Sequence, residues 1–259
     1  MSLPATLEVP IDSIEVARQV VGQATRLEVC SDLETEGWTP ELELFQRVVE
    51  LAKPTGTQVF ALIRPRIGEI IDGSDLKDFE MSPARLDASL ASIDRLAAAG
   101  ADGIAIGPLL SDGRIDRAAS SQLAERAGSN DLAVSVLRSF DLVPDRECTL
   151  EFLDEIGVVR ILTTGSDRWE IDSNSLAVRF ERLSNDVEIC RRLADASDRD
   201  PIEVMSGGGV RSSNADQFLA VSPHLHSSCR IRGEFDREEL DRLSRRMKAA
   251  GGLSCDSLD

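Results

Sequence analysis

The chain has 259 residues, of which 42% are hydrophobic, so it can bury a substantial core in one α/β barrel or in two smaller domains. It carries 46 acidic and 29 basic residues, and the formal net charge of −17 repels nucleic acids and anionic lipids, so neither is an expected partner. No apolar run reaches about 18 residues and no secretion signal opens the chain, which argues against a membrane span. The five cysteines are scattered and lack CxxC spacing, so we expect a reducing, cytoplasmic location.

Short apolar runs alternate with longer amphipathic segments along the chain, which predicts alternating strands and helices. The predicted strands are Thr6–Val9, Arg26–Cys30, Gln58–Ile63, Gly103–Ile106, Ala133–Leu137, Val158–Leu162, Ile202–Met205 and His224–His226. The predicted helices are Ser13–Gly22, Pro40–Ala52, Pro83–Ala98, Arg117–Ala127, Arg146–Ile156, Ser175–Ala196, Ser212–Leu219 and Arg237–Ala249. This order and length favour an α/β fold with a single-domain TIM (β/α)8 barrel over a doubly wound open sheet. We assign residues 1–250 to the barrel and expect residues 251–259 to be a flexible tail.

A glycine triplet follows the seventh predicted strand. Gly207, Gly208 and Gly209 end an apolar run, and a helical pattern comes directly after them. Glycines at such a junction allow a tight turn with exposed N–H groups, and the N-terminus of the following helix would add partial positive charge. The run therefore predicts an anion site, with a merely tight turn as the alternative.

Polar and charged residues follow most of the other predicted strands, and in a barrel these positions share the rim that carries the active site. Arg64 and Arg66 are suited to bidentate binding of carboxylate or phosphate, although we expect one of them to pair with a rim aspartate. Arg138 either pairs with Asp141 or faces the ligand. Thr164 offers a hydroxyl and a backbone N–H to the same anion site.

Other residues at this rim suit proton transfer or metal binding. Glu28 ends a strand inside an apolar run, so it is either the structural partner of an arginine or a general base. His224 and His226 are the only histidines and share one face of a strand, where they can serve acid–base chemistry, a metal or the core. Cys30 and Met205 are soft ligands of the kind that Cu(I) prefers, although such residues are more often core filler.

The chain contains a series of short motifs whose order and spacing can be compared with those of known families. They are Leu27–Cys30, Gly37–Pro40, Ile63–Arg66, Gly103–Gly107, Asp112–Asp116, Arg138–Asp141, Arg160–Gly165, Gly207–Val210 with Asn214, and His226–Ser228. Together they resemble the CutC family, whose members are called copper homeostasis proteins, over the stretch from about Thr25 to Ser228. The resemblance implies a TIM barrel and a cytoplasmic copper binder with ligands at Cys30 and His226. The chain departs from the family pattern at Leu137, where the family has a histidine, at Glu36, and over Ile67–Ile70.

Two functional hypotheses follow. The first is a CutC-like protein that binds Cu(I) through Cys30 and His226. The second is a TIM-barrel enzyme acting on a small phosphorylated or otherwise anionic metabolite, with Glu28 or His226 as the proton-transfer group. The anion would be held by Arg64, Arg66, Arg138, Thr164 and Gly207–Gly209. The arginines favour the second hypothesis because guanidinium groups attract phosphate and repel Cu(I), and a homodimer is the general expectation for assembly.

Overall fold

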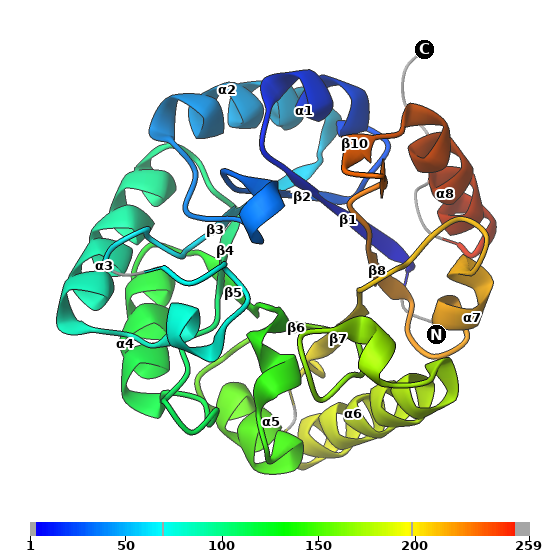
Figure 1. Cartoon of the computed structure of the whole chain (residues 1–259). Helices are drawn as coiled ribbons and strands as arrows, with labels where there is room; N and C mark the ends of the chain where they lie inside the picture. Colours follow the sequence, from blue (N-terminus) through cyan, green and yellow to red (C-terminus); the bar gives the residue numbers. More distant parts are fainter. Residues whose placement is uncertain (1–3, 69, 198, 252–259) are drawn as a thin grey trace.

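The computed structural model describes residues 4–68, 70–197 and 199–251. Eight parallel strands form a closed barrel in chain order, and β8 returns to pair with β1 (Figure 1). They are β1 (Thr6–Ile11), β2 (Arg26–Val29), β3 (Gln58–Leu62), β4 (Gly103–Ile106), β5 (Ala133–Val136), β6 (Arg160–Thr163), β7 (Glu203–Ser206) and β8 (His224–His226). The predicted TIM barrel is confirmed, because the pairing of β8 with β1 excludes an open sheet.

The helices surround this barrel (Figure 1). They are α1 (Ile14–Val20), α2 (Leu42–Ala52), α3 (Pro83–Ala98), α4 (Arg117–Gly128), α5 (Arg146–Glu155), α6 (Leu176–Ser197), α7 (Ala215–Leu219) and α8 (Arg237–Ala249). Five of them begin after a serine or aspartate whose side chain accepts a backbone N–H of the first turn, which is why their starts were predictable. These capping residues are Ser13, Ser82, Asp116, Asp145 and Asp236.

Short elements that the sequence did not predict lie in the loops. They are the 3₁₀ helices η1 (Leu33–Thr35), η2 (Lys53–Thr55), η3 (Leu76–Phe79), η4 (Arg138–Leu142) and η5 (Ile171–Ser173), and the hairpin of β9 (Arg230–Ile231) and β10 (Glu234–Phe235). Among the described residues, no helix is long and apolar enough to cross a membrane. The tail beyond Gly251 lies outside the described residues, and the predicted cytoplasmic location and homodimer stay predictions.

The strands alternate between an apolar outer face and a polar inner face. On β1, Leu7 and Val9 belong to the hydrophobic core beneath the helices, whereas Glu8 between them is buried on the other face. On β2, Arg26 and Glu28 are buried in the same way. A TIM barrel is normally filled by branched apolar side chains. The buried charges inside this one therefore point to a site.

Candidate active site at the carboxyl end of the barrel

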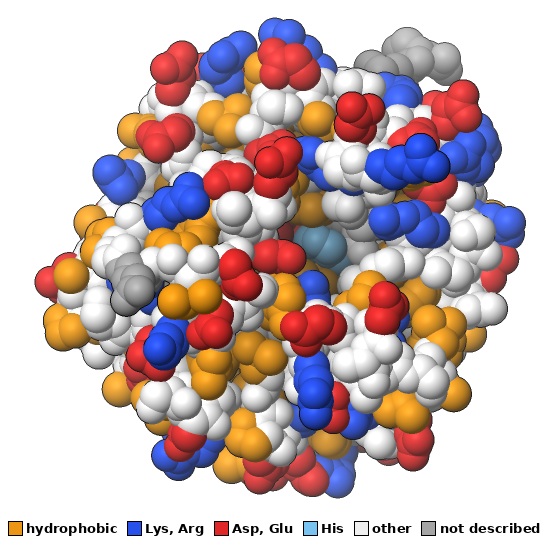
Figure 2. Space-filling model, in the orientation of Figure 1, with side chains coloured by type: hydrophobic (Ala, Val, Ile, Leu, Met, Phe, Trp, Pro, Cys, Tyr) orange, Lys and Arg blue, Asp and Glu red, His pale blue; other side chains and the backbone are white. Residues whose placement is uncertain are grey.

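A cavity of about 260 Å³ opens where the strands end, and Figure 2 shows a hollow on this face with a histidine inside it. Its lining comes from residues at or just beyond the ends of β1, β2, β3, β5, β6, β7 and β8. Six of the predicted site residues line it: Glu28, Arg64, Arg138, Gly208, Gly209 and His226. The barrel thus brings together residues that lie far apart in the sequence.

His226 is held by a buried carboxylate. Its Nδ1 lies 2.8 Å from Oε1 of Glu8, and the other carboxylate oxygen of Glu8 accepts a hydrogen bond from Nε of Arg26. Burial acts to raise the pKa of Glu8, but the charge of Arg26 and the bond to His226 outweigh it, so this pKa is lowered. Burial acts to lower the pKa of His226, but the bond to Glu8 and its charge outweigh it, so this pKa is raised. With Nδ1 occupied, Nε2 is the ring nitrogen that remains for a ligand in the cavity.

Glu28 lies beside this pair. Burial, followed by the negative charge of Glu8, raises the pKa of Glu28 from 4.5 to about 7. Within the described parts of the chain no hydrogen bond or ion pair is found for its carboxylate, so the alternative of a structural arginine partner is not supported. Ligand atoms of Glu8, Glu28 and His226 all lie within 4.8 Å of one another. With a pKa of about 7, Glu28 can donate or accept a proton near neutral pH.

Arginines and aromatic rings form the opposite wall. The guanidinium carbon of Arg64 lies 4.3 Å from the ring centroids of both Trp38 and Phe79. That of Arg138 lies 4.2 Å from the ring of Trp169, which itself contacts Phe79 with centroids 5.3 Å apart. The Nε atoms of Arg64 and Arg138 are buried without a hydrogen-bond partner. Stacking therefore fixes two positive groups beside the cavity, where they attract an anionic ligand.

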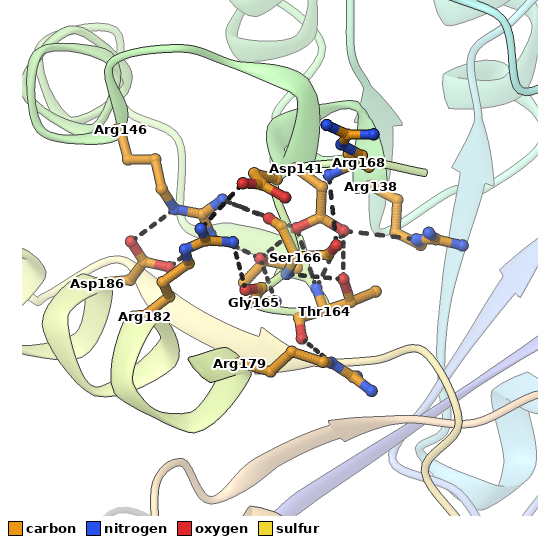
Figure 3. A network of polar contacts seen from close by, with 12 residues as sticks. Arg138, Asp141, Arg146, Thr164, Gly165, Ser166, Arg168, Arg179, Arg182 and Asp186 are labelled. Carbon is orange, nitrogen blue, oxygen red and sulfur yellow. Dashed lines mark hydrogen bonds and ion pairs between the residues drawn. The ribbon is translucent and has the colours of Figure 1, made fainter. Parts of the chain in front are cut away.

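Arg138 belongs to a network of polar contacts centred on Asp141 (Figure 3). Oδ1 of Asp141 accepts a hydrogen bond from the hydroxyl of Thr163 at 2.6 Å, and Oδ2 accepts one from the hydroxyl of Thr164 at 2.7 Å. Nε of Arg138 lies 3.6 Å from Oδ2 of Asp141. Arg138 therefore pairs with Asp141 and also lines the cavity, and a role in holding the ligand stays a prediction. The hydroxyl of Thr164 is already bonded to Asp141, and Thr164 does not line the cavity.

Three further predicted residues lie outside the cavity lining. Arg66 pairs with Asp32 at 3.0 Å on the surface, which is the rim pairing expected for one of the two arginines. Gly207 donates its N–H to the carbonyl of Thr163 within the barrel. Cys30 is buried, and burial, followed by the charge of Glu28, raises the pKa of its thiol well above the ordinary value. The thiol of Cys30 packs in an apolar cluster instead of facing the cavity.

The remaining soft or imidazole ligands are also separated from His226. Met205 is buried with its sulfur 4.0 Å from Nη2 of Arg26. Nδ1 of His224 lies 2.8 Å from the hydroxyl of Thr6, and burial lowers the pKa of His224. In the described part of the chain, the group of three residues that could hold a metal ion is Glu8, Glu28 and His226. Neither His224 nor Cys30 belongs to it.

Comparison with known proteins identifies the family. The sequence model of the CutC family matches residues 5–231. A CutC family protein of Vibrio atlanticus is 33% identical over 226 residues, covering 86% of this chain and 81% of its own length. The chain belongs to the CutC family. The human relative, named copper homeostasis protein cutC homolog, is 32% identical over 231 residues and covers 89% of this chain and 74% of its own.

Solved structures support the fold of this CutC chain. A crystal structure of a CutC protein from Streptococcus agalactiae superposes with a TM-score of 0.72 at 23% identity, covering 86% of this chain and 98% of that one. A deoxyribose phosphate aldolase from Aeropyrum pernix gives a TM-score of 0.59 at 15% identity, covering 94% and 90%. At these identities the likeness shows a shared TIM-barrel fold.

Several residues of the site were not predicted from the sequence: Glu8, which supports His226 without lining the cavity, and some residues of the lining itself. Glu8 was read as part of an apolar strand, although a lone acidic residue at an alternate position is a signal for an inward-facing charge. Arg211 and Arg230 also line the cavity, and each follows a predicted strand end within a few residues. Trp169 lies in a loop with no periodic pattern, so nothing in the sequence placed it there. Leu137 lines the cavity, and among the described lining residues His226 is the histidine.

Proposed function

We propose that this CutC chain is an enzyme that binds a small anionic metabolite, such as a sugar phosphate, and transfers a proton on it with Glu28 and His226. The observation that carries the proposal is that Glu28, with a pKa of about 7, and His226, with a raised pKa, line the same cavity as the arginines and the glycine turn. General acid–base groups work best when their pKa lies near the working pH, and Glu28 meets that condition.

The size of the cavity limits the substrate. Its volume of about 260 Å³ lies just below the usual range of ligand pockets. This volume equals that of roughly nine water molecules, so a metabolite of about ten non-hydrogen atoms fills it. The anionic group of such a molecule would lie against the arginines and the glycine turn, and its reacting C–H or O–H group near Glu28 and Nε2 of His226.

Exchange of substrate hydrogen with solvent tests the proposal. We would incubate small phosphorylated aldoses and ketoses with the protein in D₂O and follow loss of the C–H signal by NMR. Glu28→Gln and His226→Gln keep the size of the side chain but remove the titrating group, so each should slow exchange by about 10²–10⁴-fold. Arg66→Gln is the matched control, because Arg66 lies outside the cavity lining. Exchange that is absent in the wild type, or equally fast in both variants, contradicts the proposal.

Copper is the second candidate because relatives carry the name copper homeostasis protein. A Cu(I) site at Cys30 and His226 fits the structure poorly: the thiol is buried with a raised pKa, and protonated thiols are weak ligands. The donor set found together, two carboxylates and an imidazole, suits a divalent ion better than Cu(I). Arg26 also holds Glu8 and repels a cation.

A competition experiment with a chelator distinguishes a Cu(I) site at Cys30 from a Cu²⁺ site at the carboxylates. Titration of the protein with Cu(I) against a strong chelator should give no tight site that depends on Cys30, so Cys30→Ser should equal the wild type. A tight Cu(I) site lost in Cys30→Ser would favour the copper function. If Cu²⁺ binds at the carboxylate cluster instead, Glu28→Gln should weaken it and Cys30→Ser should not.

A further inference from the structure

In the turn after β7, two side chains donate hydrogen bonds to the backbone carbonyl groups. Nη2 of Arg179 donates to the carbonyl oxygens of Gly207 and Gly208, at 3.2 and 2.7 Å. Nδ2 of Asn214 donates to the carbonyl oxygen of Gly209 at 3.0 Å. Three consecutive carbonyls are therefore fixed by two side chains.

These contacts also fix the direction of the N–H groups. Each carbonyl shares a planar peptide unit with the next residue, and in a trans peptide the N–H points opposite to the C=O. There are no cis peptide bonds among the described residues. The N–H groups of Gly208, Gly209 and Val210 therefore point away from Arg179 and Asn214. These three residues line the cavity, whereas Arg179 and Asn214 do not.

The three N–H groups are free to bind a ligand. In residues 4–68, 70–197 and 199–251, none of them donates a hydrogen bond to the protein. Gly208 and Gly209 have φ of +68° and +83°, a conformation that favours glycine. A Cβ at Gly208 would lie 2.4 Å from Cγ2 of Thr164, so a side chain there does not fit. The turn is thus built so that bare backbone faces the cavity.

Arg179 adds an electrostatic contribution. Its side chain comes from α6 and is only 4% exposed (Figure 3). Its Nε donates to the carbonyl of Thr164 at 2.7 Å, and no carboxylate forms an ion pair with it among the described residues. A buried cation bound only to carbonyls keeps its attraction for an anion on the other side of the turn. The sequence-based prediction placed this role on a helix dipole, but α7 begins only at Ala215 and spans five residues.

We propose that the N–H groups of Gly208, Gly209 and Val210 form a cup for a phosphate monoester, and that Arg179 and Asn214 are positioning residues that orient it. The inference rests on the proposed function, because both place the anionic group in one cavity. Three donors in a row match the three terminal oxygens of a phosphate monoester better than the two oxygens of a carboxylate. Arg211 and Arg230 line the cavity and add positive charge, while Glu36 is an acidic residue of the lining.

Phosphate binding to the full chain tests the cup. We would titrate the ¹⁵N-labelled protein with inorganic phosphate, glycerol phosphate and acetate, and follow the amide signals of Gly208, Gly209 and Val210. Phosphate and glycerol phosphate should shift these signals, and acetate should bind about tenfold more weakly. Phosphate binding that leaves all three amides unmoved overturns the cup, and equal binding of acetate overturns the assignment to phosphate.

Two variants test the positioning residues. Arg179→Gln should weaken phosphate about tenfold or more, and Asn214→Ala about threefold, because the N–H groups lose their fixed direction. Arg182→Gln is the control: Arg182 lies on the same helix and pairs with Asp167, so it removes a charge without touching the glycine turn. Equal phosphate affinity in Arg179→Gln, Asn214→Ala and the control overturns the positioning role. If Arg179→Gln does not fold, Asn214→Ala and the wild-type amide shifts decide the question.

The outcome also separates the cup from the proposed reaction. Glu28→Gln should keep the affinity for phosphate while losing proton exchange. Phosphate binding with the expected amide shifts but no exchange on any substrate refutes the enzyme and keeps the cup. Exchange without those amide shifts refutes the cup and keeps the enzyme.

Discussion

Glu28→Gln should make the protein more stable above neutral pH. In the folded chain the pKa of Glu28 is about 7, compared with an ordinary value of 4.5. The folded state therefore holds this proton more tightly than the unfolded state, and the resulting stabilisation is present below pH 4.5 and is lost as the pH rises to 7. The shift corresponds to about 3 kcal/mol. Glutamine is neutral at every pH, so the variant does not lose this contribution.

Thermal denaturation followed by circular dichroism at pH 5 and pH 8 measures the effect. About 2.5 kcal/mol of this effect develops between the two pH values, so the difference in Tm between Glu28→Gln and wild type should grow by roughly 5–10 °C, at 2–4 °C for each kcal/mol. Because the charge of Glu8 also raises the pKa of Glu28, the midpoint of the change depends on both carboxyl groups. Glu147→Gln is a suitable control, since Glu147 is an exposed carboxylate far from this pair in the chain. A Tm difference that stays constant from pH 5 to pH 8 refutes the argument that Glu28 is buried without a compensating partner.

Further outcomes follow from the same structure. The two histidines should titrate on opposite sides of the ordinary value in an NMR pH titration, His226 above 6.5 and His224 below it, and the reverse order would contradict the assignment of Glu8 as the partner of His226. The chain has two tryptophans and no tyrosine, so its fluorescence should respond to phosphate or sugar phosphates in the cavity, and Trp169→Phe should lose most of that response. Asp141→Asn should lower stability by about 1.5–3 kcal/mol in urea denaturation, because the buried carboxylate that accepts hydrogen bonds from Thr163 and Thr164 loses its charge. An unchanged denaturation midpoint would show that the network in Figure 3 carries little of the stability.

The fold could be read from the sequence because each element carries a local signal. The predicted range of β4 and β8 matches the structure residue for residue, since both are short apolar or alternating runs between turn residues. The start of α7 was wrong by three residues for a tertiary reason. The backbone N–H and hydroxyl of Ser212 bind the carboxylate of Glu239 on α8, at 2.6 and 2.8 Å. A contact across 27 positions in the chain leaves no pattern near Ser212.

The site was predictable only in part. Strand ends identify which segments reach the rim, and this located Glu28, Arg64 and His226 in one cavity. Past the end of a strand the alternation of side chains no longer holds, so Arg66 could not be assigned to the cavity or to the surface from its position. The partner of His226 was hidden because Glu8 lies 218 positions away and is brought to it by the closure of β8 on β1.

The charged interior links the fold to the proposed chemistry. A buried ion pair such as Glu8 with Arg26 is often no better for stability than well-packed apolar residues of similar volume, and TIM barrels are ordinarily filled by such residues. The pair is therefore poorly explained by stability. What it does provide is an ionised carboxylate at Nδ1 of His226, which raises the pKa of the imidazole, and a negative charge that raises the pKa of Glu28. A barrel needs none of these shifts in order to fold, whereas a pair of groups that exchange a proton at neutral pH depends on them.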